Sequence, residues 1–325
     1  MAAAAPGVAA GMSRVVVATA FGGPEVLSVV EQPDAPPGPG EAVLEVRAAG
    51  VNPADWKGYT GAFGADPSRL PLRLGFEAAG IVGTVGEGAT GPAGPLAVGD
   101  EVIAFRVSGA YADRLVVPAG ALVPKPAALD WPAAAGLMLT GATAVHALTA
   151  TGVGEGDTVL VHGAAGGVGL ALVQLARTRG ARVLGTAGPD GADLVARLGG
   201  EPVRYGPGLA DRVRDLAPDG VDAAVDAVGT DEAVDVSLEL VADRGRIASI
   251  AAFGRADTGI RLLGGGPGAD PGTEVRAAAR LELVRLVEQG RFEVVVAGTW
   301  PLDDVAAAHR EGMTGHSHGK LVLVP

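Results

Sequence analysis

Residues 161–170 read VHGAAGGVGL, and this stretch decides the fold of the second half of the chain. Four of its ten residues are glycine, although glycine destabilises a helix by roughly 0.5–1 kcal/mol relative to alanine. The stretch begins in the apolar run 158–162, which is typical of a buried strand, and leads into an amphipathic helical pattern at 168–179. A strand, a glycine-rich turn and a helix in this order are typical of the first unit of a dinucleotide-binding sheet.

The glycines have a chemical reason in such a turn. A bare main chain can approach a diphosphate closely, and the N–H groups at the start of the following helix point at it. In the usual G-x-G-x-x-G pattern, Ala164 stands at the first glycine, and Gly166 and Gly169 stand at the second and third. The alternative is a glycine-rich surface turn. The expected cofactor contacts in the turn are Ala165, Gly166, Gly167 and Val168.

The residues after the next expected strand favour NADPH over NADH. An acidic residue there would bind a ribose 2′-hydroxyl and select NADH, and none occurs before Asp190. Thr186 and Tyr205, with Arg204 beside the tyrosine, are candidate donors to a 2′-phosphate. NADH stays the alternative, because no lysine or arginine lies between Gly185 and Asp193.

The composition limits the other classes of function. The 325 residues carry a formal net charge of −12 and include no cysteine. An acidic surface disfavours nucleic acid as a partner, and a chain without cysteine has no disulfide or thiolate nucleophile. Residues 132–154 contain no charged side chain, and we interpret them as a buried helix and turn rather than a membrane span. Residues 1–12 are expected to form a disordered tail.

The strand pattern predicts an α/β protein with two kinds of sheet. Up to about residue 130, short β-branched runs are bounded by glycine, proline and aspartate, a pattern that favours an antiparallel barrel or sandwich. After Pro132, strand-like runs alternate with helical ones, which favours a parallel sheet with right-handed crossovers.

Several segments, in order, resemble one family. They include GGPEVL, GPGEAVLEVRAAGVNPADWK, GFEAAGIVGTVGEG, VHGAAGGVG, VDAAVDAVG and GKLVL. The chain resembles the medium-chain dehydrogenase/reductase superfamily, in its zinc-free quinone-oxidoreductase or zeta-crystallin-like branch. The resemblance implies a GroES-like β-barrel catalytic domain at 13–132 and 290–325. It also implies a Rossmann NADP-binding domain with a doubly wound parallel sheet at 133–289, and a homodimer.

The ligands that zinc-using relatives employ are missing from this chain. Those relatives carry a cysteine where this chain has Asn52, and Gly-His-Glu where it has Gly75-Phe76-Glu77. Since phenylalanine cannot bind a metal, we expect no metal site. His316 and His318 are expected to lie in a solvated loop.

Without a metal, a suitable hydride acceptor is a quinone or an activated C=C bond, whose negative charge spreads to a remote oxygen and needs only hydrogen-bond donors. The candidate donors lie in the NPADWKGYTG segment. The resemblance implies that Asn52 lies near nicotinamide and substrate. Lys57 stands where some relatives have a tyrosine; it would stabilise an enolate or act as an acid, or it is a surface lysine or a partner of Asp55.

The resemblance also implies cofactor contacts elsewhere in the chain. Thr143 would contact the nicotinamide amide, and Lys320 would approach the cofactor from the C-terminal segment. The run 249–253 would line the nicotinamide ribose through residues that include Ser249 and Phe253.

Together these inferences predict a cytoplasmic, NADPH-dependent, zinc-independent oxidoreductase that transfers hydride to a quinone or an enone. Its partner is a small-molecule substrate, with no nucleic acid and no membrane. Two alternatives stay open: an enoyl-thioester reductase of a biosynthetic pathway, and a non-catalytic NADPH-binding protein.

Overall fold

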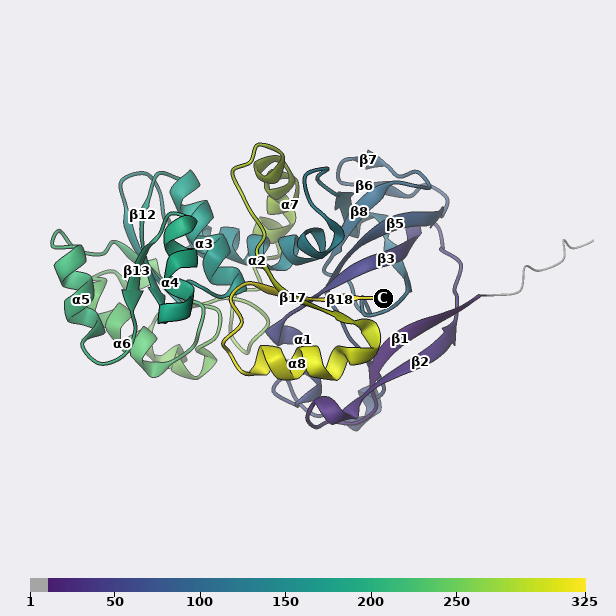
Figure 1. Cartoon of the computed structure of the whole chain (residues 1–325), viewed down its shortest axis with the longest axis horizontal. Coiled ribbons are helices and arrows are strands. Elements are labelled where there is room, and N and C mark those ends of the chain that lie inside the picture. Colours follow the sequence, from purple (N-terminus) through teal and green to yellow (C-terminus); the bar gives the residue numbers. More distant parts are fainter. Residues whose placement is uncertain (1–10) are drawn as a thin grey trace, which may run out of the picture. The chain divides into compact units, whose positions relative to one another are not determined.

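A computed structural model describes residues 11–325, and the chain divides into two compact units (Figure 1). The first comprises the chain up to Lys125 together with Thr299–Met313 and Val322–Pro325. The second comprises Pro126–Gly298 and Thr314–Leu321. The sequence prediction drew its first boundary at 132/133 and assigned all of 290–325 to the first domain. In the structure the second unit begins at Pro126 and also includes residues 290–298 and 314–321.

The expected disordered tail covered residues 1–12, of which 1–10 lie outside the described residues. At residue 12 the prediction was wrong, because Met12 begins strand β1 (Met12–Ala18), which pairs antiparallel with β2 (Leu27–Pro33). Val15 and Val17 of β1 are buried in a small apolar cluster, and this burial stabilises the strand.

The strands of the first unit pair antiparallel, as the short β-branched runs predict. A seven-stranded sheet has the order β10-β8-β5-β3-β18-β17 with β9 on β3, and a three-stranded sheet has the order β2-β1-β4. Two strands, β17 and β18, continue into the second unit. The remaining strands are β3 (Glu41–Val51), β4 (Leu72–Arg73), β5 (Glu77–Val85), β6 (Thr90–Gly91), β7 (Gly94–Pro95), β8 (Glu101–Phe105), β9 (Arg114–Pro118), β10 (Leu122–Pro124), β17 (Val296–Pro301) and β18 (Lys320–Val324).

Two α-helices of this unit, α1 and α8, pack on each other. Helix α1 begins directly after the long strand β3, which pairs with both β5 and β9. Its first residue is a proline, whose fixed φ suits a helix start. The helices and 3₁₀ turns are η1 (Pro24–Val26), α1 (Pro53–Tyr59), η2 (Pro67–Arg69), η3 (Ala119–Ala121), η6 (Leu302–Asp304) and α8 (Val305–Met313).

The second unit contains a six-stranded sheet in the order β13-β12-β11-β14-β15-β16. Every pair in it is parallel, as the alternation of strands and helices predicts. The glycine-rich stretch forms a turn between β11 and α3. The strands are β11 (Thr158–His162), β12 (Arg182–Ala187), β13 (Glu201–Arg204), β14 (Ala223–Asp226), β15 (Ile247–Ser249) and β16 (Arg261–Leu262).

Helices cover this sheet, with α3 on β11 and β12, α4 on β12 and β13, and α6 on β14 and β15. One apolar cluster holds a residue from each of the six strands: Leu160, Leu184, Val203, Ala224, Ile247 and Leu262. Apolar residues are typical of parallel strands covered by helices. The helices and 3₁₀ turns are α2 (Trp131–Ala150), α3 (Gly167–Thr178), α4 (Pro189–Arg197), α5 (Leu209–Leu216), α6 (Asp231–Leu240), η4 (Arg244–Arg246), η5 (Phe253–Thr258) and α7 (Thr273–Glu288).

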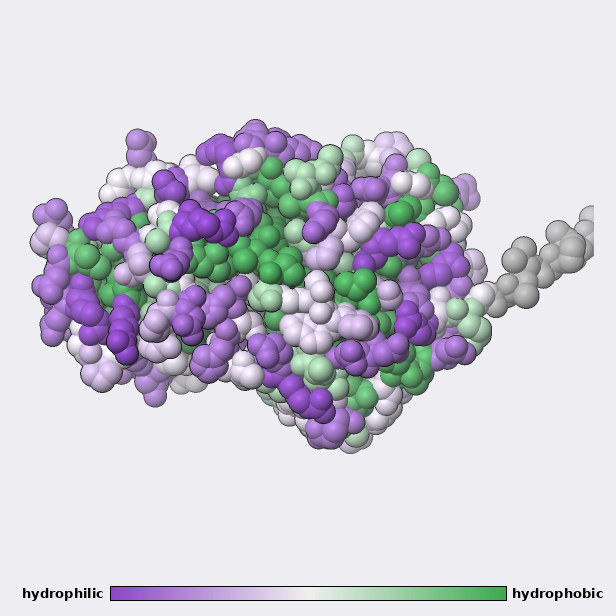
Figure 2. All heavy atoms as spheres, viewed as in Figure 1, coloured by the Kyte–Doolittle hydropathy of each residue, from purple (hydrophilic) through white to green (hydrophobic). Residues whose placement is uncertain are grey.

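Helix α2 carries the uncharged stretch of the sequence. Within residues 11–325 it is the one helix that is long and apolar enough to cross a membrane by length and composition, and 78% of its most apolar window is buried inside the structure. It packs against α3 and α7, so the prediction of a buried helix is confirmed. Apolar surface gathers between α4 and α2 on the visible face (Figure 2).

Candidate functional site

The glycine turn (residues 163–167) lies where the order of the parallel sheet reverses. Strand β11 is followed in sequence by β12 on one side, while β14 pairs on its other side. Ligands of doubly wound sheets bind at the carboxyl ends of the strands, at this reversal. The turn therefore occupies the expected ligand position, and Ala165–Val168 are partly exposed there.

The glycines of the turn do not all serve the same purpose. Gly163 has a φ of +71°, which favours glycine. A Cβ on Gly169 would lie 2.1 Å from the Gly163 carbonyl oxygen, so the close approach of helix and turn requires a bare main chain. Gly166 has an ordinary φ of −77°, and a Cβ there would meet nothing closer than 3.4 Å. Since the fold does not require glycine at 166, the bare surface there fits a diphosphate bound against the main chain.

Thr186, at the end of β12, holds the turn in place. Its hydroxyl accepts from the Gly163 N–H at 3.0 Å, and its carbonyl oxygen accepts from the Ala164 N–H at 2.9 Å. Thr186 is also buried. The structure thus gives it a role in shaping the turn that the sequence did not reveal; donation to a 2′-phosphate stays a prediction.

Lys320 lies at the start of α3. Although it is buried, its Cδ lies 3.4 Å from where a Cβ on Gly167 would stand, and its Cγ lies 2.9 Å from the equivalent point on Gly136. The N-terminus of a helix carries a partial positive charge. A lysine beside it strengthens the attraction for an anion, so the predicted position of Lys320 near the cofactor fits the glycine turn.

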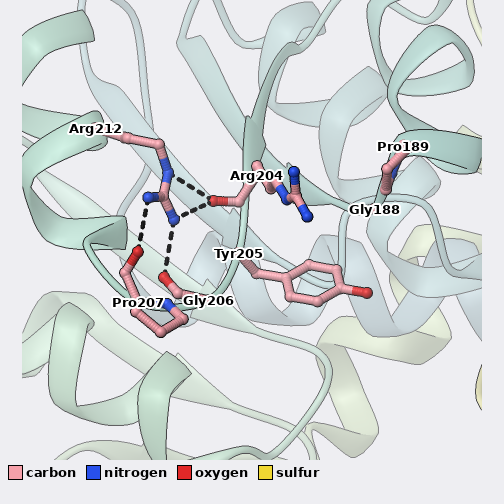
Figure 3. A pocket seen from close by; sticks show the side chains of 7 residues that line it. All are labelled: Gly188, Pro189, Arg204, Tyr205, Gly206, Pro207 and Arg212. Atoms are coloured by element: carbon pink, nitrogen blue, oxygen red, sulfur yellow. Dashed lines mark hydrogen bonds between the residues drawn. The ribbon is translucent and has the colours of Figure 1, made fainter.

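A recess of about 490 Å³ opens beside the ends of β12 and β13. Tyr205 is half exposed in it, and the Arg204 side chain extends toward Gly188 and Pro189 (Figure 3). The recess thus presents a guanidinium and a phenol, both of which can donate to a phosphate. Its lining residues are Gly188, Pro189, Arg204, Tyr205, Gly206, Pro207 and Arg212.

Arg212 stabilises the loop that forms one wall of this recess. Its guanidinium donates to the carbonyl oxygens of Arg204, Gly206 and Pro207 at 2.7–3.0 Å (Figure 3). The Arg212 guanidinium is thus bonded to the main chain, and its bonds hold the loop from which Tyr205 projects. No sequence pattern indicated this role, since Arg212 is one of several charged residues on the amphipathic helix α5.

Two other predicted contacts are occupied by internal hydrogen bonds. Ser249 is fully buried, and its hydroxyl donates to Asp226 at 2.6 Å and accepts from the Ala251 and Ala252 N–H groups. It shapes the loop before Phe253, which is partly exposed. A serine without exposed surface contacts a ligand only after its neighbours move, so Ser249 supports the loop in this conformation.

Thr143 is buried on α2, where its hydroxyl accepts from Arg276 of α7 at 3.0 Å. The same arginine donates to His146, whose other ring nitrogen bonds to Asp270. Because a threonine hydroxyl that accepts one bond can still donate another, the predicted contact from Thr143 to a carboxamide oxygen is compatible with this arrangement.

Asn52, in the first unit, caps helix α1 and is buried. Its amide nitrogen donates to the Gly50 carbonyl oxygen at 3.2 Å and to Glu77 Oε1 at 3.1 Å. An amide NH₂ has two hydrogens, and the protein uses both. The catalytic role of Asn52 and its place beside the cofactor stay predictions; to donate to substrate, the amide would have to give up one of these two bonds.

Lys57 lies two residues after Asp55 on α1 and is partly buried. Two residues of an α-helix span about 200° around its axis, so Lys57 projects away from the face formed by the buried Asp55 and Tyr59.

The C-terminal loop holds a residue that sequence reasoning placed in solvent. His318 is half buried, and its Nδ1 lies 2.9 Å from where a Cβ on Gly191 would stand. That nitrogen and the Ser317 hydroxyl are buried and make no hydrogen bond in the described structure. A Cβ on Gly191 would also meet Ala165 of the glycine turn, so this loop borders the candidate cofactor site.

Two other histidines are buried and neutral. His162 bonds to Ser237, and His309 lies between two tyrosines. Burial lowers the pKa of each to about 4 from 6.5. Between these values the unfolded chain binds more protons than the folded chain, so stability falls as the pH falls from 6.5 toward 4.

We expect His309→Gln to weaken this acid sensitivity, since glutamine keeps a donor and an acceptor but does not titrate. The slope of the free energy of unfolding against pH should decrease by about 1.4 kcal/mol per pH unit below pH 6.5. Urea titrations followed by circular dichroism at a series of pH values measure the slope. An unchanged slope would mean that His309 is already protonated in the folded protein.

Comparison with known proteins supports one family. Residues 38–127 match the family described as alcohol dehydrogenase GroES-like domain, and residues 191–323 match the one described as zinc-binding dehydrogenase. A quinone oxidoreductase of Pseudomonas aeruginosa is 34% identical over 97% of this chain and 100% of its own length. The synaptic vesicle membrane protein VAT-1 homolog of Mus musculus is 30% identical over 96% of this chain and 84% of its own.

Solved structures agree with this relationship. Quinone oxidoreductase of Escherichia coli, complexed with NADPH, superimposes with a TM-score of 0.83 at 30% identity, over 96% of this chain and 100% of that one. An NAD-dependent alcohol dehydrogenase has a TM-score of 0.82 at 31% identity, over 96% and 99%. The chain belongs to the medium-chain dehydrogenase/reductase superfamily, in its quinone-oxidoreductase branch. This confirms the resemblance and the predicted α/β fold, with its GroES-like and Rossmann parts.

One matching family is named for zinc, but the residues of this chain do not fit a zinc site. Across residues 11–325, no group of three or more His, Cys, Asp or Glu side chains lies in an arrangement that could hold a metal ion. The relevant segments contain Asn52 and Phe76 and no cysteine, and these side chains offer neither a thiolate nor an imidazole. We therefore derive no step that passes through a metal.

Proposed function

We propose that this protein is an NADPH-dependent, zinc-independent oxidoreductase that transfers a hydride to a quinone or to the C=C bond of an enone. The observation that carries the proposal is the bare main chain at Gly166, which the fold does not itself require. When bound, NADPH would supply the hydride. Binding of the cofactor and stabilisation of the reduced acceptor belong to side chains and main-chain groups of the protein.

The main-chain N–H groups of Ala165, Gly167 and Val168 would bind the diphosphate, whereas that of Gly166 donates to the Gly163 carbonyl oxygen within the turn. Lys320 would add positive charge beside them. The recess with Arg204 and Tyr205 would accept the adenosine end with its 2′-phosphate. Both lie at the carboxyl ends of the parallel strands, where a doubly wound sheet binds dinucleotides. The relative complexed with NADPH favours the same cofactor for this chain.

Reduction of a quinone or an enone places negative charge on an oxygen of the acceptor, which must then be stabilised or protonated. Both amide hydrogens of Asn52 are bonded within the protein, so we assign this role to Lys57. Asn52 would contribute by fixing the segment that precedes α1. An ammonium group can both stabilise the charge and give up a proton.

The preference for NADPH provides a direct test of the recess. We expect Arg204→Ala to weaken NADPH binding by about tenfold or more and to leave NADH binding unchanged, because hydrogen bonds to charged groups contribute about 1.5–3 kcal/mol. Fluorescence titration with both nucleotides measures the ratio. Arg214→Ala is the matched control, since Arg214 is bonded to Asp211 and Glu239, outside the recess. Equal losses for both nucleotides would contradict the assignment.

The proposed activity is tested by measuring oxidation of NADPH and NADH with quinones, enones and enoyl thioesters. We expect turnover with NADPH and quinones or enones, and no loss of rate with EDTA. A rate that EDTA abolishes and zinc restores would overturn the proposal. Much higher activity on thioesters would favour the enoyl-thioester alternative, and binding without reduction would favour a non-catalytic protein.

We also propose, on the sequence and the family, that the protein acts in the cytoplasm as a homodimer on a small-molecule substrate. Light scattering of the purified protein tests the oligomeric state. A monomer at micromolar concentration would contradict the dimer without affecting the proposed chemistry.

A further inference from the structure

A fully buried set of side chains joins helices α1 and α8 in the first unit. The Tyr59 hydroxyl bonds to His309 Nδ1 at 2.9 Å, and His309 Nε2 lies 3.3 Å from the Tyr111 hydroxyl. The rings of both tyrosines contact the imidazole, with Tyr59 stacked and Tyr111 edge-on. All three side chains are buried, so water does not compete for these bonds.

A neutral imidazole has one N–H, so His309 donates from one ring nitrogen and accepts at the other. It therefore bonds to both tyrosine hydroxyls at once and ties Tyr59 of α1 to Tyr111. Burial raises the pKa of both tyrosines and lowers that of His309, which keeps all three groups uncharged.

Asp55 lies one turn before Tyr59 on α1, and the Tyr111 ring packs directly against Gly75. One carboxylate oxygen of Asp55 accepts from the Asn52 N–H at 2.8 Å, and the other accepts from the Gly75 N–H at 3.1 Å. Asn52 in turn bonds to Glu77, two residues beyond Gly75. The Asp55 carboxylate therefore holds both the segment that contains Asn52 and the segment around Gly75 that leads to its partner Glu77.

We propose that the buried bonds of His309 to Tyr59 and Tyr111 hold α1 in register with the segment around Gly75, so that Asp55 binds the N–H groups of both segments. His309 is thereby a positioning residue for the Asn52 segment. The proposal rests on the proposed function for its effect on turnover. Sequence reasoning did not find it, because His309 lies 250 positions from Tyr59 and 198 from Tyr111.

The test compares variants that break or preserve the bonds of His309. We expect Tyr111→Phe and His309→Leu to lower kcat by about tenfold, because small displacements of positioned groups reduce rates strongly. The dissociation constant for NADPH should stay unchanged. His309→Gln should restore most of the rate, since its amide can accept from one tyrosine and donate to the other. Ser237→Ala is the matched control: it removes a buried hydroxyl bonded to another histidine and should leave kcat unchanged.

A second measurement does not depend on activity. Hydrogen exchange of the Asn52 and Gly75 backbone amides should become faster in Tyr111→Phe and His309→Leu, while other amides of the first unit keep their rates. Faster exchange throughout the unit, or an unchanged kcat in both variants, would overturn the proposal. If the wild-type protein reduces no acceptor, the proposed function fails, and the exchange at these two amides alone decides the positioning role.

Discussion

Replacing Gly166 with valine is expected to abolish NADPH binding while leaving the fold intact. The valine side chain would occupy the space in which the diphosphate lies against the main chain. Each hydrogen bond lost to a charged phosphate is worth about 1.5–3 kcal/mol, so the loss of two or more corresponds to at least about a 100-fold weaker affinity. Titration of NADPH fluorescence with the variant measures this loss.

The same structure explains why this variant should fold. Gly166 is the N-cap of α3 with φ −77° and ψ 169°, an extended conformation that β-branched residues adopt readily. A Cβ there is only in van der Waals contact with the Gly163 oxygen. Valine is a poorer N-cap, which costs about 1 kcal/mol.

Gly154→Val is the matched control, because a Cβ on Gly154 meets nothing within 4 Å and lies outside the glycine turn. It should bind NADPH like the wild type. Retained affinity in Gly166→Val would refute the glycine turn as the diphosphate site. A large loss of stability in that variant would be a second contradiction, since it would mean that the fold itself needs glycine at 166.

Lys57→Ala is expected to lower turnover by about 100-fold with little effect on NADPH affinity. Positioned proton donors contribute about 10²–10⁴ to rate, and we assign the donor to Lys57 because Asn52 uses both of its amide hydrogens within the protein. Lys57 lies on the other face of α1 from Asp55 and Tyr59, so removing it should not disturb the buried side chains there. Steady-state kcat and a separate NADPH titration distinguish the two quantities.

Lys57→Arg separates the two ways in which the lysine can act. Arginine keeps the positive charge but does not deprotonate near neutral pH. A partly restored rate would show that charge stabilisation dominates, and a rate as low as that of alanine would show that the proton is needed. If Lys57→Ala turns over like the wild type, the side chain is a surface lysine and the acceptor is protonated by another group.

Local patterns in the sequence predicted the elements that position the site. The expected helix at 168–179 is α3, Gly167–Thr178, because its start follows from the glycine turn and its end from the arginines and glycine after it. The parallel sheet was predicted from apolar runs, each of which can be recognised in the sequence without knowing which strand it pairs with. The β-branched run that begins at Arg14 predicted strand β1, but not its start at Met12, because that start depends on pairing with Pro33, which is distant in sequence.

The roles of individual polar residues were predicted less well, because they depend on contacts between distant parts of the chain. Asn52 was assigned as a donor, but its hydrogens go to Gly50 and to Glu77, a partner 25 positions away. The Ser249 hydroxyl donates to Asp226, and the Thr143 hydroxyl accepts from Arg276, which is 133 positions away. A sequence motif specifies which group is present, whereas tertiary packing decides which of its hydrogens and lone pairs remain available.

The hydrogen bonds from Arg212 to three main-chain carbonyl oxygens have a consequence for redesign of the coenzyme preference. They hold residues 204–207 in one conformation without help from a ligand, so little ordering entropy is lost when a nucleotide arrives. An exchange of coenzyme preference would then require new side chains at positions 204 and 205 rather than a new loop. Replacing Arg212 would loosen the loop at residues 204–207 and so weaken the binding of NADPH and of NADH to a similar degree.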